Sequence, residues 1–273
     1  MTTPSPASAL RFERVSVLFE DVPALLDVSF EVAEGESCVI LGAAGSGKTV
    51  LLKTALGLIK PDRGRVSVFG RDITELKEEE LFDIRARLGM LFQEGGLFDS
   101  LTIEENVAYP LVNQRVVERP PDDVRERVEE ALRFVELEHT LEKFPSELSG
   151  GMRRRVGIAR AVVTEPALVL YDSPTAGLDP ITAYTIIALI VKERDLRGAT
   201  TMMVTHRYQD GVWLSDFRYN PENGTLVPEA GNGHPLPART RFMVLEEGRL
   251  VFQGNRAELE ACRDPYVAKF VKR

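Results

Sequence analysis

The sequence predicts an α/β fold in which a parallel β-sheet carries helices on both faces. Short, continuously apolar segments at 38–41, 167–171 and 201–204 are typical of buried parallel strands. Segments with helical spacing, at 49–58 and 181–196, alternate with those strands. A glycine-rich turn joins the first of these strands to the first helix. This strand–loop–helix unit indicates a phosphate-loop nucleotide-binding core.

The N-terminal region departs from this parallel pattern. Residues 1–9 have neither a basic region nor a long apolar run, so we expect a disordered tail and not a signal peptide. Alternating apolar residues at 10–19 and 26–32 predict two antiparallel strands. We therefore expect an antiparallel β lobe before the parallel core.

A mostly helical stretch interrupts the core from residue 94 to about residue 163. Pro110, the pair at 120–121 and Pro145 are expected to separate its helices. No second strand–helix alternation lies in this stretch, so we interpret it as an inserted helical lobe within one domain. That single domain is expected to cover residues 10–273.

The last part of the chain begins with an expected loop insertion at 216–240. Its centre, 221–237, is rich in proline, glycine and asparagine. A hairpin with strands at 242–245 and 249–252 is expected to follow. Two short helices are expected to end the chain.

The composition excludes several kinds of protein. Among 273 residues, 42 are acidic and 34 are basic, and the net charge of −8 argues against a nucleic-acid partner and against direct adhesion to an anionic membrane. Two cysteines are too few for a disulfide framework. No apolar run approaches the roughly 18–20 residues that span a bilayer. If the protein acts at a membrane, we expect another polypeptide to hold it there.

Residues 42–49 fit the pattern G-x-x-x-x-G-K-[ST] between a strand and a helix, and we call them the phosphate loop. Glycines let backbone N–H groups turn toward phosphate oxygens, and the helix start adds positive potential. Lys48 adds a full charge, and the Thr49 hydroxyl is offered to Mg²⁺. The candidate nucleotide-binding residues here are Gly42, Ala43, Ala44, Gly45, Ser46, Gly47, Lys48, Thr49 and Val50.

Two further segments carry related chemistry. Asp172 ends an apolar strand, where an acid in a phosphate-loop protein orients Mg²⁺. Ser149, Gly150 and Gly151 begin a second glycine-rich helix, although a surface turn with a helix cap is the alternative. One molecule cannot point both helix starts at the same nucleotide, so the sequence predicts a dimer with nucleotide between subunits. The arginines at 153–155 are expected on a solvated or ion-paired face of that helix.

Taken together, these segments resemble the ATP-binding subunits of ABC transporters over nearly the whole chain. The resemblance implies that Phe19 stacks on adenine, Gln93 reaches Mg²⁺ and faces a transmembrane partner, and His206 contacts the γ-phosphate. It also implies that Asp179 belongs to a loop that signals across the dimer. The alternatives are a core role for Phe19, a polar strand end for Gln93 and a satisfied histidine for His206.

The same resemblance implies the cofactors and partners. ATP and Mg²⁺ are expected, with Thr49, Gln93 and Asp172 at the metal. The expected partners are a second ATPase protomer and two transmembrane permease subunits, at the cytoplasmic face of the inner membrane. A soluble ABC ATPase without a transporter is a weaker alternative, because neither a coiled-coil insertion nor a second cassette is present.

A narrower resemblance points to lipid transport. Segments 90–93, 96–98, 105–111 and 264–270, with Met152 in the second glycine motif, resemble the ATPase of bacterial phospholipid (Mla) and Mce-type transport systems. The resemblance implies that the substrate is a phospholipid or related lipid and that an MCE-type lipid-binding protein belongs to the complex. A non-lipid ABC importer is the alternative.

The residue after Asp172 departs from the family pattern. A glutamate that accepts a proton from the attacking water is normal there, whereas this chain has Ser173. A serine hydroxyl is too weakly basic for that role, and a general base is worth about 10²–10⁴ in rate. Other groups could position the water well enough, or the subunit could be a hydrolysis-poor ATP-gated clamp, or the sequence could be altered. The candidate catalytic residues are Lys48, Gln93, Asp172, Ser173, Asp179 and His206.

Overall fold

A six-stranded sheet forms the centre of the molecule in the computed structural model, which describes residues 7–113, 120–228 and 240–271. Its strand order is β12-β11-β3-β8-β7-β6, and the pairs from β11 to β6 are parallel. Only β12 runs antiparallel to its neighbour. The strands are β3 (Ser37–Leu41), β6 (Leu88–Leu91), β7 (Leu168–Asp172), β8 (Thr200–Thr205), β11 (Thr240–Glu246) and β12 (Arg249–Gly254). The predicted parallel core and final hairpin are confirmed.

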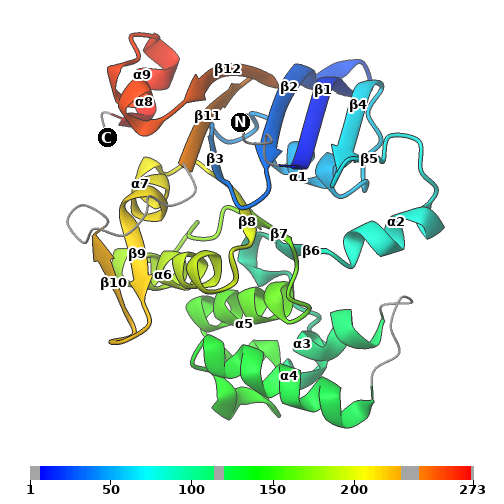
Figure 1. Ribbon diagram of the computed structural model, residues 1–273, viewed down its shortest axis with the longest axis vertical. Coiled ribbons are helices and arrows are strands. Elements are labelled where there is room, and N and C mark those ends of the chain that lie inside the picture. Colours follow the sequence, from blue (N-terminus) through cyan, green and yellow to red (C-terminus); the bar gives the residue numbers. More distant parts are fainter. Residues whose placement is uncertain (1–6, 114–119, 229–239, 272–273) are drawn as a thin grey trace, which may run out of the picture.

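An antiparallel sheet of order β2-β1-β4-β5 lies above this core in Figure 1. It consists of β1 (Ser8–Phe19), β2 (Val22–Ala33), β4 (Arg63–Val68) and β5 (Arg71–Asp72). The predicted antiparallel lobe is confirmed, but its first strand starts earlier than expected. Ser8 and Ala9 pair within the sheet because Ala9 is fully buried, so the predicted tail is too long by these residues. Residues 1–6 lie outside the described residues.

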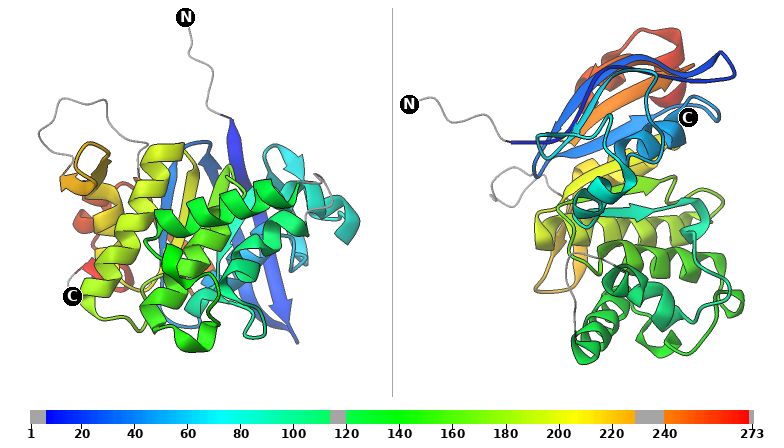
Figure 2. Two further views of the ribbon diagram at one scale, coloured as in Figure 1. Left: turned by 90° about the horizontal axis from the view of Figure 1, so that it is seen from below. Right: turned by 90° about the vertical axis from the view of Figure 1, so that its right-hand side faces the viewer.

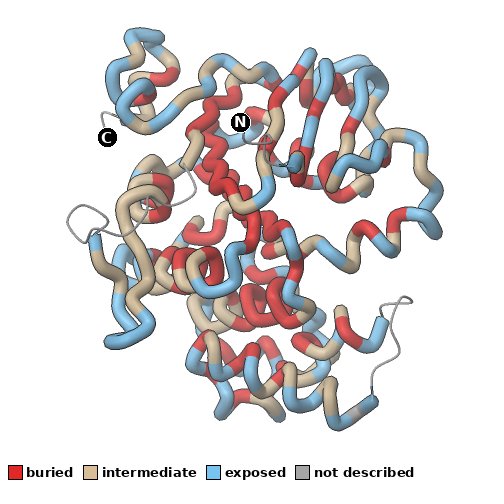
Figure 3. Tube along the Cα trace, viewed as in Figure 1, coloured by how far each residue is buried: buried red, intermediate tan, exposed pale blue. Residues whose placement is uncertain are grey.

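Successive residues of the central strands pack into two different cores. Val39 and Leu41 join one hydrophobic cluster, and Cys38 and Ile40 join the other. Side chains alternate along a strand, so the sheet separates the two clusters. Helix α1 (Lys48–Ala55) and α2 (Glu78–Arg85) pack with the antiparallel lobe, whereas α5 (Gly150–Val162) and α6 (Pro180–Arg197) cover the opposite face. Figure 3 shows buried residues along the central strands and through α5.

The helical stretch after β6 contains α3 (Ile103–Val112), α4 (Pro121–Phe134) and α5, joined by the short turns η1 (Gln93–Gly95), η2 (Glu138–Thr140) and η3 (Pro145–Glu147). Figure 2 shows these helices gathered on the side away from the antiparallel lobe. The prediction that Pro110 separates two helices is wrong, because it lies inside α3. Proline lacks only its own N–H, so α3 loses one backbone hydrogen bond at Pro110 and continues for two more residues.

The expected loop insertion at 216–240 is partly ordered as secondary structure. Asp216 ends α7 (Tyr208–Asp216), and β9 (Phe217–Asn220) pairs with β10 (Thr225–Pro228) in an antiparallel hairpin. The loop prediction is therefore wrong for these residues, because α6 anchors the hairpin. The Tyr219 N–H donates to Asp195 Oδ2 at 2.8 Å, and Arg194 donates to the Phe217 carbonyl at 2.8 Å. Residues 229–239 of the prediction lie outside the described residues.

Two short helices, α8 (Arg256–Ala261) and α9 (Pro265–Val271), follow the final hairpin as predicted. In the described segments, none of the helices combines the length and the apolar character needed to cross a bilayer.

Candidate functional site

The candidate residues gather at one edge of the parallel sheet. Because β3, β8, β7 and β6 are parallel neighbours, their carboxyl ends meet at the same edge (Figure 1). The phosphate loop follows β3, His206 follows β8, Asp172 ends β7 and Gln93 lies just beyond β6. The sheet topology therefore brings together four segments that lie far apart in the sequence.

The phosphate loop needs glycine at two of its positions for steric reasons. A Cβ on Gly47 would lie 2.3 Å from the Ala24 carbonyl oxygen, and one on Gly42 would lie 2.4 Å from Ser46 Oγ. Gly47 also has a φ of 102°, which disfavours any other residue. The Gly248 N–H donates to the Ser46 carbonyl at 3.0 Å, so the turn between β11 and β12 packs against the phosphate loop and holds its backbone.

Lys48 lies at the first position of α1, and its ammonium group points back into the loop. Nζ donates to the carbonyls of Gly42 at 2.9 Å and Ala43 at 2.7 Å, and to Ser46 Oγ at 3.2 Å. Burial lowers the pKa of Lys48, and the nearby Asp172 carboxylate partly offsets this. An anion in the loop would favour the charged ammonium. No side chain caps α1, so its first N–H groups face the loop as an anion site would require.

Thr49 and Asp172 place two oxygen atoms, a hydroxyl and a carboxylate, where they could bind Mg²⁺. Thr49 Oγ1 donates to Asp172 Oδ2 at 2.8 Å. Neighbouring ligand oxygens of octahedral Mg²⁺, each about 2.0–2.1 Å from the ion, lie about 3 Å apart, so this pair fits such a site. Gln93 is exposed at the start of η1, one strand away from Asp172 along the sheet edge.

Ser173 is held in an unusual backbone conformation beside Asp172. Its φ is 48°, in the left-handed region, and its N–H donates to the Val204 carbonyl at 2.9 Å. Its hydroxyl donates to Asp172 Oδ1 at 3.0 Å. Asp172 therefore accepts hydrogen bonds from Thr49 on one oxygen and from Ser173 on the other. The serine hydroxyl thus orients a carboxylate.

A buried acid that the sequence analysis missed supports the His206 segment. Asp210 Oδ2 accepts hydrogen bonds from Thr175 Oγ1 at 2.6 Å and from Thr205 Oγ1 at 2.8 Å. Burial raises the pKa of Asp210, whereas these hydrogen bonds lower it. Asp210 links the loop after β7 to the end of β8, and so fixes the backbone from which the exposed His206 projects. A single acid without a recognisable motif around it gave no signal of this role.

The second glycine motif, residues 148–152, forms the start of α5, and we call it the signature segment. Ser149 caps α5, because its hydroxyl accepts from the Met152 N–H at 3.2 Å. A Cβ on Gly151 would lie 2.6 Å from Thr182 Cγ2, so glycine allows α5 to approach the start of α6. Asp179 caps α6 by accepting from the Ile181 and Thr182 N–H groups at 3.0 Å each.

The structure does not bring the signature segment to the phosphate loop of the same molecule. Among the described residues, no hydrogen bond or ion pair joins the two segments. Their helices, α5 and α1, pack on opposite faces of the central sheet. The predicted site residues therefore fall into two groups, one at the sheet edge and one at the start of α5.

One of the arginines that follow the signature segment is buried, which corrects the expectation of a solvated helix face. Arg154 donates to the Pro174 carbonyl and to the Ala176 carbonyl, each at 2.7 Å. These carbonyls belong to the loop between β7 and α6 and need donors because they are partly enclosed. Arg154 thus ties the signature helix to the loop that contains Ser173 and Asp179.

Phe19 lies at the end of β1 with 50% of its surface exposed, which excludes the alternative of a core residue. The hairpin of β1 and β2 carries Ala24, whose carbonyl oxygen faces Gly47. An exposed aromatic ring on a hairpin that borders the phosphate loop has the properties of a stacking surface for a base.

The central parallel sheet, the antiparallel lobe and the helical insertion together form the ABC ATPase fold. The family model described as ABC transporter matches residues 25–176, more than half of the chain, and the chain belongs to this family. A solved ATP-binding cassette, MJ0796 in a dimeric post-hydrolysis state bound to ADP and Pi, matches with a TM-score of 0.75 and 29% identity. That match covers 90% of this chain and 98% of the other. CbiO1 from Clostridium perfringens, part of the transporter complex cbiONQ, also gives 0.75, with 28% identity, covering 97% of this chain and 94% of the other.

Curated relatives are transporter ATP-binding proteins of different named substrates. The probable ribonucleotide transport ATP-binding protein mkl of Mycobacterium leprae is 41% identical over 66% of this chain and 51% of its own length. The methionine import ATP-binding protein MetN of Carboxydothermus hydrogenoformans is 39% identical over 76% of this chain and 61% of its own length. The chain thus spans between about half and three fifths of these relatives.

Proposed function

We propose that this chain is the ATP-binding and ATP-hydrolysing subunit of a membrane ABC transporter. The observation that carries the proposal is the arrangement of Lys48, Thr49 and Asp172 at the phosphate loop. Lys48 and the helix start attract the phosphates, while Thr49 and Asp172, with Gln93, would hold Mg²⁺. When bound, Mg²⁺ would offset negative charge on the phosphates. Phe19 offers its exposed ring to the adenine.

A second copy of the chain would complete this site. The signature segment is exposed at Ser149 and Gly150. In the proposed dimer, the signature segment of one copy covers the nucleotide on the phosphate loop of the other. Arg154 joins the loop that contains Asp179 to the signature helix. When the two copies close over ATP, a movement of the signature helix would therefore be transmitted to this loop. The dimeric MJ0796 cassette with ADP and Pi supports this arrangement.

Hydrolysis is proposed to be slow because the sheet edge lacks the usual carboxylate after Asp172. Ser173 donates a hydrogen bond to Asp172, and its hydroxyl oxygen is too weakly basic to take a proton from the attacking water. Gln93, Asp179 and His206 would then share the positioning of the attacking water. The hydrolysis-poor ATP-gated clamp is the second candidate, and the Ser173–Asp172 hydrogen bond is the observation that favours it.

The proposed permease docks beside Gln93. A groove of about 580 Å³ lies between α2, β6 and α3, and apolar residues such as Phe92, Phe98, Tyr109 and Pro110 line it. Phe98 and Tyr109 are each 41% exposed, and their rings pack 4.6 Å apart. Exposed aromatic side chains that gather in one groove favour a protein partner. We propose that each of two permease subunits inserts a segment here, at the cytoplasmic face of the inner membrane.

The proposed substrate is a phospholipid or related lipid, with an MCE-type lipid-binding protein in the complex. Segments 96–98, 105–111 and 264–270, together with Met152, support this proposal by their resemblance to lipid-transport ATPases. The names of the relatives, ribonucleotide transport and methionine import, favour instead an importer of small polar molecules. Because a permease selects the substrate, the ATP site is compatible with both.

Purification of the tagged chain from detergent-solubilised native membranes tests these proposals. The expected result is co-purification of a permease, and ATP hydrolysis by the complex that a phospholipid stimulates more than methionine or ribonucleotides do. If only a small polar molecule stimulates ATP hydrolysis, the proposed substrate is that class of molecule and not a lipid. A complex that binds ATP without turnover would support the clamp. Recovery of the chain without any membrane subunit would contradict the transporter.

A further inference from the structure

The C-terminal helix α9 reaches the phosphate loop from outside the candidate ATP site. The hydroxyl of Tyr266 accepts a hydrogen bond from the Ala43 N–H at 3.1 Å and donates to the Leu245 carbonyl at 3.3 Å. Ala43 is the second residue of the phosphate loop, and Leu245 lies on β11. One side chain therefore connects the loop to the neighbouring strand.

This bridge lies where the two parallel strands stop pairing. The last registered pair between β3 and β11 is Leu41 with Val244. Beyond it, the chain leaves the sheet to form the phosphate loop, and a Cβ on Gly42 would already lie 2.7 Å from the Leu245 carbonyl oxygen. The Tyr266 hydroxyl joins the Leu245 carbonyl, one residue past this pair, to the Ala43 N–H, two residues past it. It thereby extends the backbone hydrogen bonding of the sheet into the first turn of the loop.

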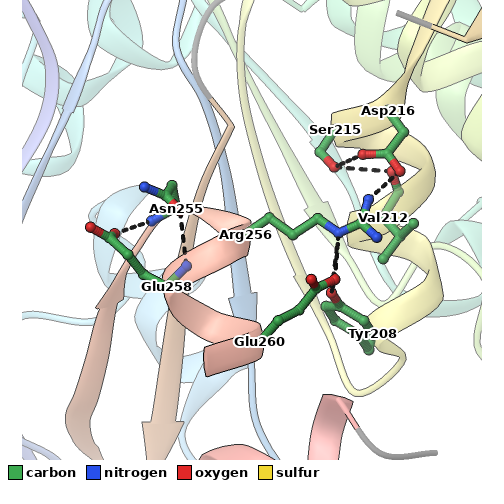
Figure 4. Close-up of polar contacts among 8 residues, drawn as sticks. All are labelled: Tyr208, Val212, Ser215, Asp216, Asn255, Arg256, Glu258 and Glu260. Carbon is green, nitrogen blue, oxygen red and sulfur yellow. Dashed lines mark hydrogen bonds and ion pairs between the residues drawn. The ribbon is translucent and has the colours of Figure 1, made fainter. Parts of the chain in front are cut away.

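A polar network anchors α8, the helix that precedes α9, to α7 (Figure 4). On α8, Arg256 forms an ion pair with Asp216 of α7 and donates to Glu260 at 2.7 Å. Tyr208, at the start of α7, donates to Glu260 at 2.6 Å. On α9, Val267 is fully buried. The polar contacts fix α8 against α7, and Val267 packs in the same hydrophobic cluster as Leu259 of α8, which holds the helix that carries Tyr266.

The surroundings of Tyr266 connect it with the nucleotide site. A cavity of about 620 Å³ is bordered by Ala43, Ala44, His206 and Tyr266. The Tyr266 ring packs edge-on against Phe270 with 5.4 Å between the ring centroids. The ring is thus held by apolar packing, whereas the hydroxyl alone makes the contact with the loop. Removing the hydroxyl oxygen therefore takes away the contact with the loop and leaves the packing of the ring.

We propose that Tyr266 is a positioning residue for ATP binding, which acts by holding the first turn of the phosphate loop in place. The inference rests on the proposed ATP site. A loop that is ordered before the nucleotide arrives loses less conformational entropy on binding. Without the hydroxyl, the Ala43 N–H and the Leu245 carbonyl lose their common partner and the loop start becomes less constrained. ATP affinity then falls, while the groups that act at the γ-phosphate stay unchanged.

The test compares MgATP binding by the full chain with that of two matched variants, using calorimetry. Tyr266→Phe keeps the ring and removes the bridge, and we expect it to raise the Kd by about threefold to tenfold, the range for one hydrogen bond. Tyr208→Phe removes a hydroxyl from the α7–α8 network instead, and we expect a Kd within about twofold of the unmodified chain. At saturating ATP, the kcat of Tyr266→Phe should stay within about twofold.

Four outcomes separate the possibilities, with circular dichroism used to confirm that each variant is folded. No binding by the unmodified chain would overturn the proposed ATP site and this inference with it. Binding by the unmodified chain with an unchanged or tighter Kd for Tyr266→Phe would overturn the inference alone. Equal weakening in both variants would show general loosening of the C-terminal helices and would also overturn it. A raised Kd in Tyr266→Phe only, with kcat retained, supports it.

Discussion

The two glycine-rich helix starts of this molecule differ in how much of their environment the chain itself supplies. The phosphate loop is enclosed by β2, by the turn at Gly248 and by Tyr266, and its Lys48 is buried. The signature segment projects Gly150 into open space, where only the guanidinium of Arg153, 4.0 Å away, would meet an added Cβ. The contrast supports the proposed dimer, in which one chain assembles the phosphate loop and a second copy covers it with its signature segment.

Among the substitutions that test the difference between the two helix starts, Lys48→Ala is expected to have the largest effect, a loss of ATP affinity. Lys48 is the only full positive charge within the phosphate loop, and a charged hydrogen bond to phosphate is worth about 1.5–3 kcal/mol. We expect ATP affinity, measured by calorimetry, to fall by about a hundredfold. Lys53→Ala is the matched control, because Lys53 is exposed on the same helix, and it should bind ATP normally. Equal Kd values for both variants would contradict the phosphate-loop site.

A smaller but opposite effect is expected for Ser173→Glu. The added carboxylate would supply the missing proton acceptor, so steady-state ATP hydrolysis should rise at least about tenfold. Ser173→Gln is the control, because its side chain has similar size and no basicity, and it should give no rise. If the unmodified chain already hydrolyses ATP rapidly and Ser173→Glu changes nothing, another group supplies the base.

The smallest effect is expected for Ser149→Ala. The hydroxyl caps α5 through the Met152 N–H, and loss of such a cap lowers the free energy of unfolding by about 1 kcal/mol. Urea denaturation measures this loss, with the exposed Ser146→Ala as control. Because Ser149 lies away from the phosphate loop of its own chain, ATP binding by the monomer should not change. A higher Kd for ATP in the monomeric Ser149→Ala variant would contradict the separation of the signature segment from the phosphate loop of the same chain.

Local features of the sequence predicted most of the phosphate-binding site. The apolar strand, the glycine-rich turn and the helix that starts at Lys48 are adjacent in the chain, and periodicity and steric demands identify each one. Asp172 was predictable for the same reason, as the last residue of an apolar strand.

Contacts between distant segments could not be predicted in this way. Ala43 and Tyr266 are 223 residues apart, and nothing in either local sequence indicates their hydrogen bond. Arg154 cannot be told from the arginines on either side of it in the sequence, because its burial depends on the loop at 173–178. Asp210 depends in the same way on two threonines from other elements. Pro110 misled for a related reason, because its place within the last turns of α3 depends on where that helix ends.

ATP is proposed to join two copies of this chain through the signature segment. Light scattering after size-exclusion chromatography, with and without MgATP, tests it on the unmodified chain and on Gly150→Asp. The substitution places a carboxylate on the exposed helix start, where the partner's bound phosphates would repel it. We predict that MgATP doubles the mass of the unmodified chain, whereas Gly150→Asp binds ATP with the same Kd and stays monomeric. An ATP-bound unmodified chain that remains monomeric, or a Gly150→Asp variant that dimerises equally well, would contradict the proposed ATP-linked dimer.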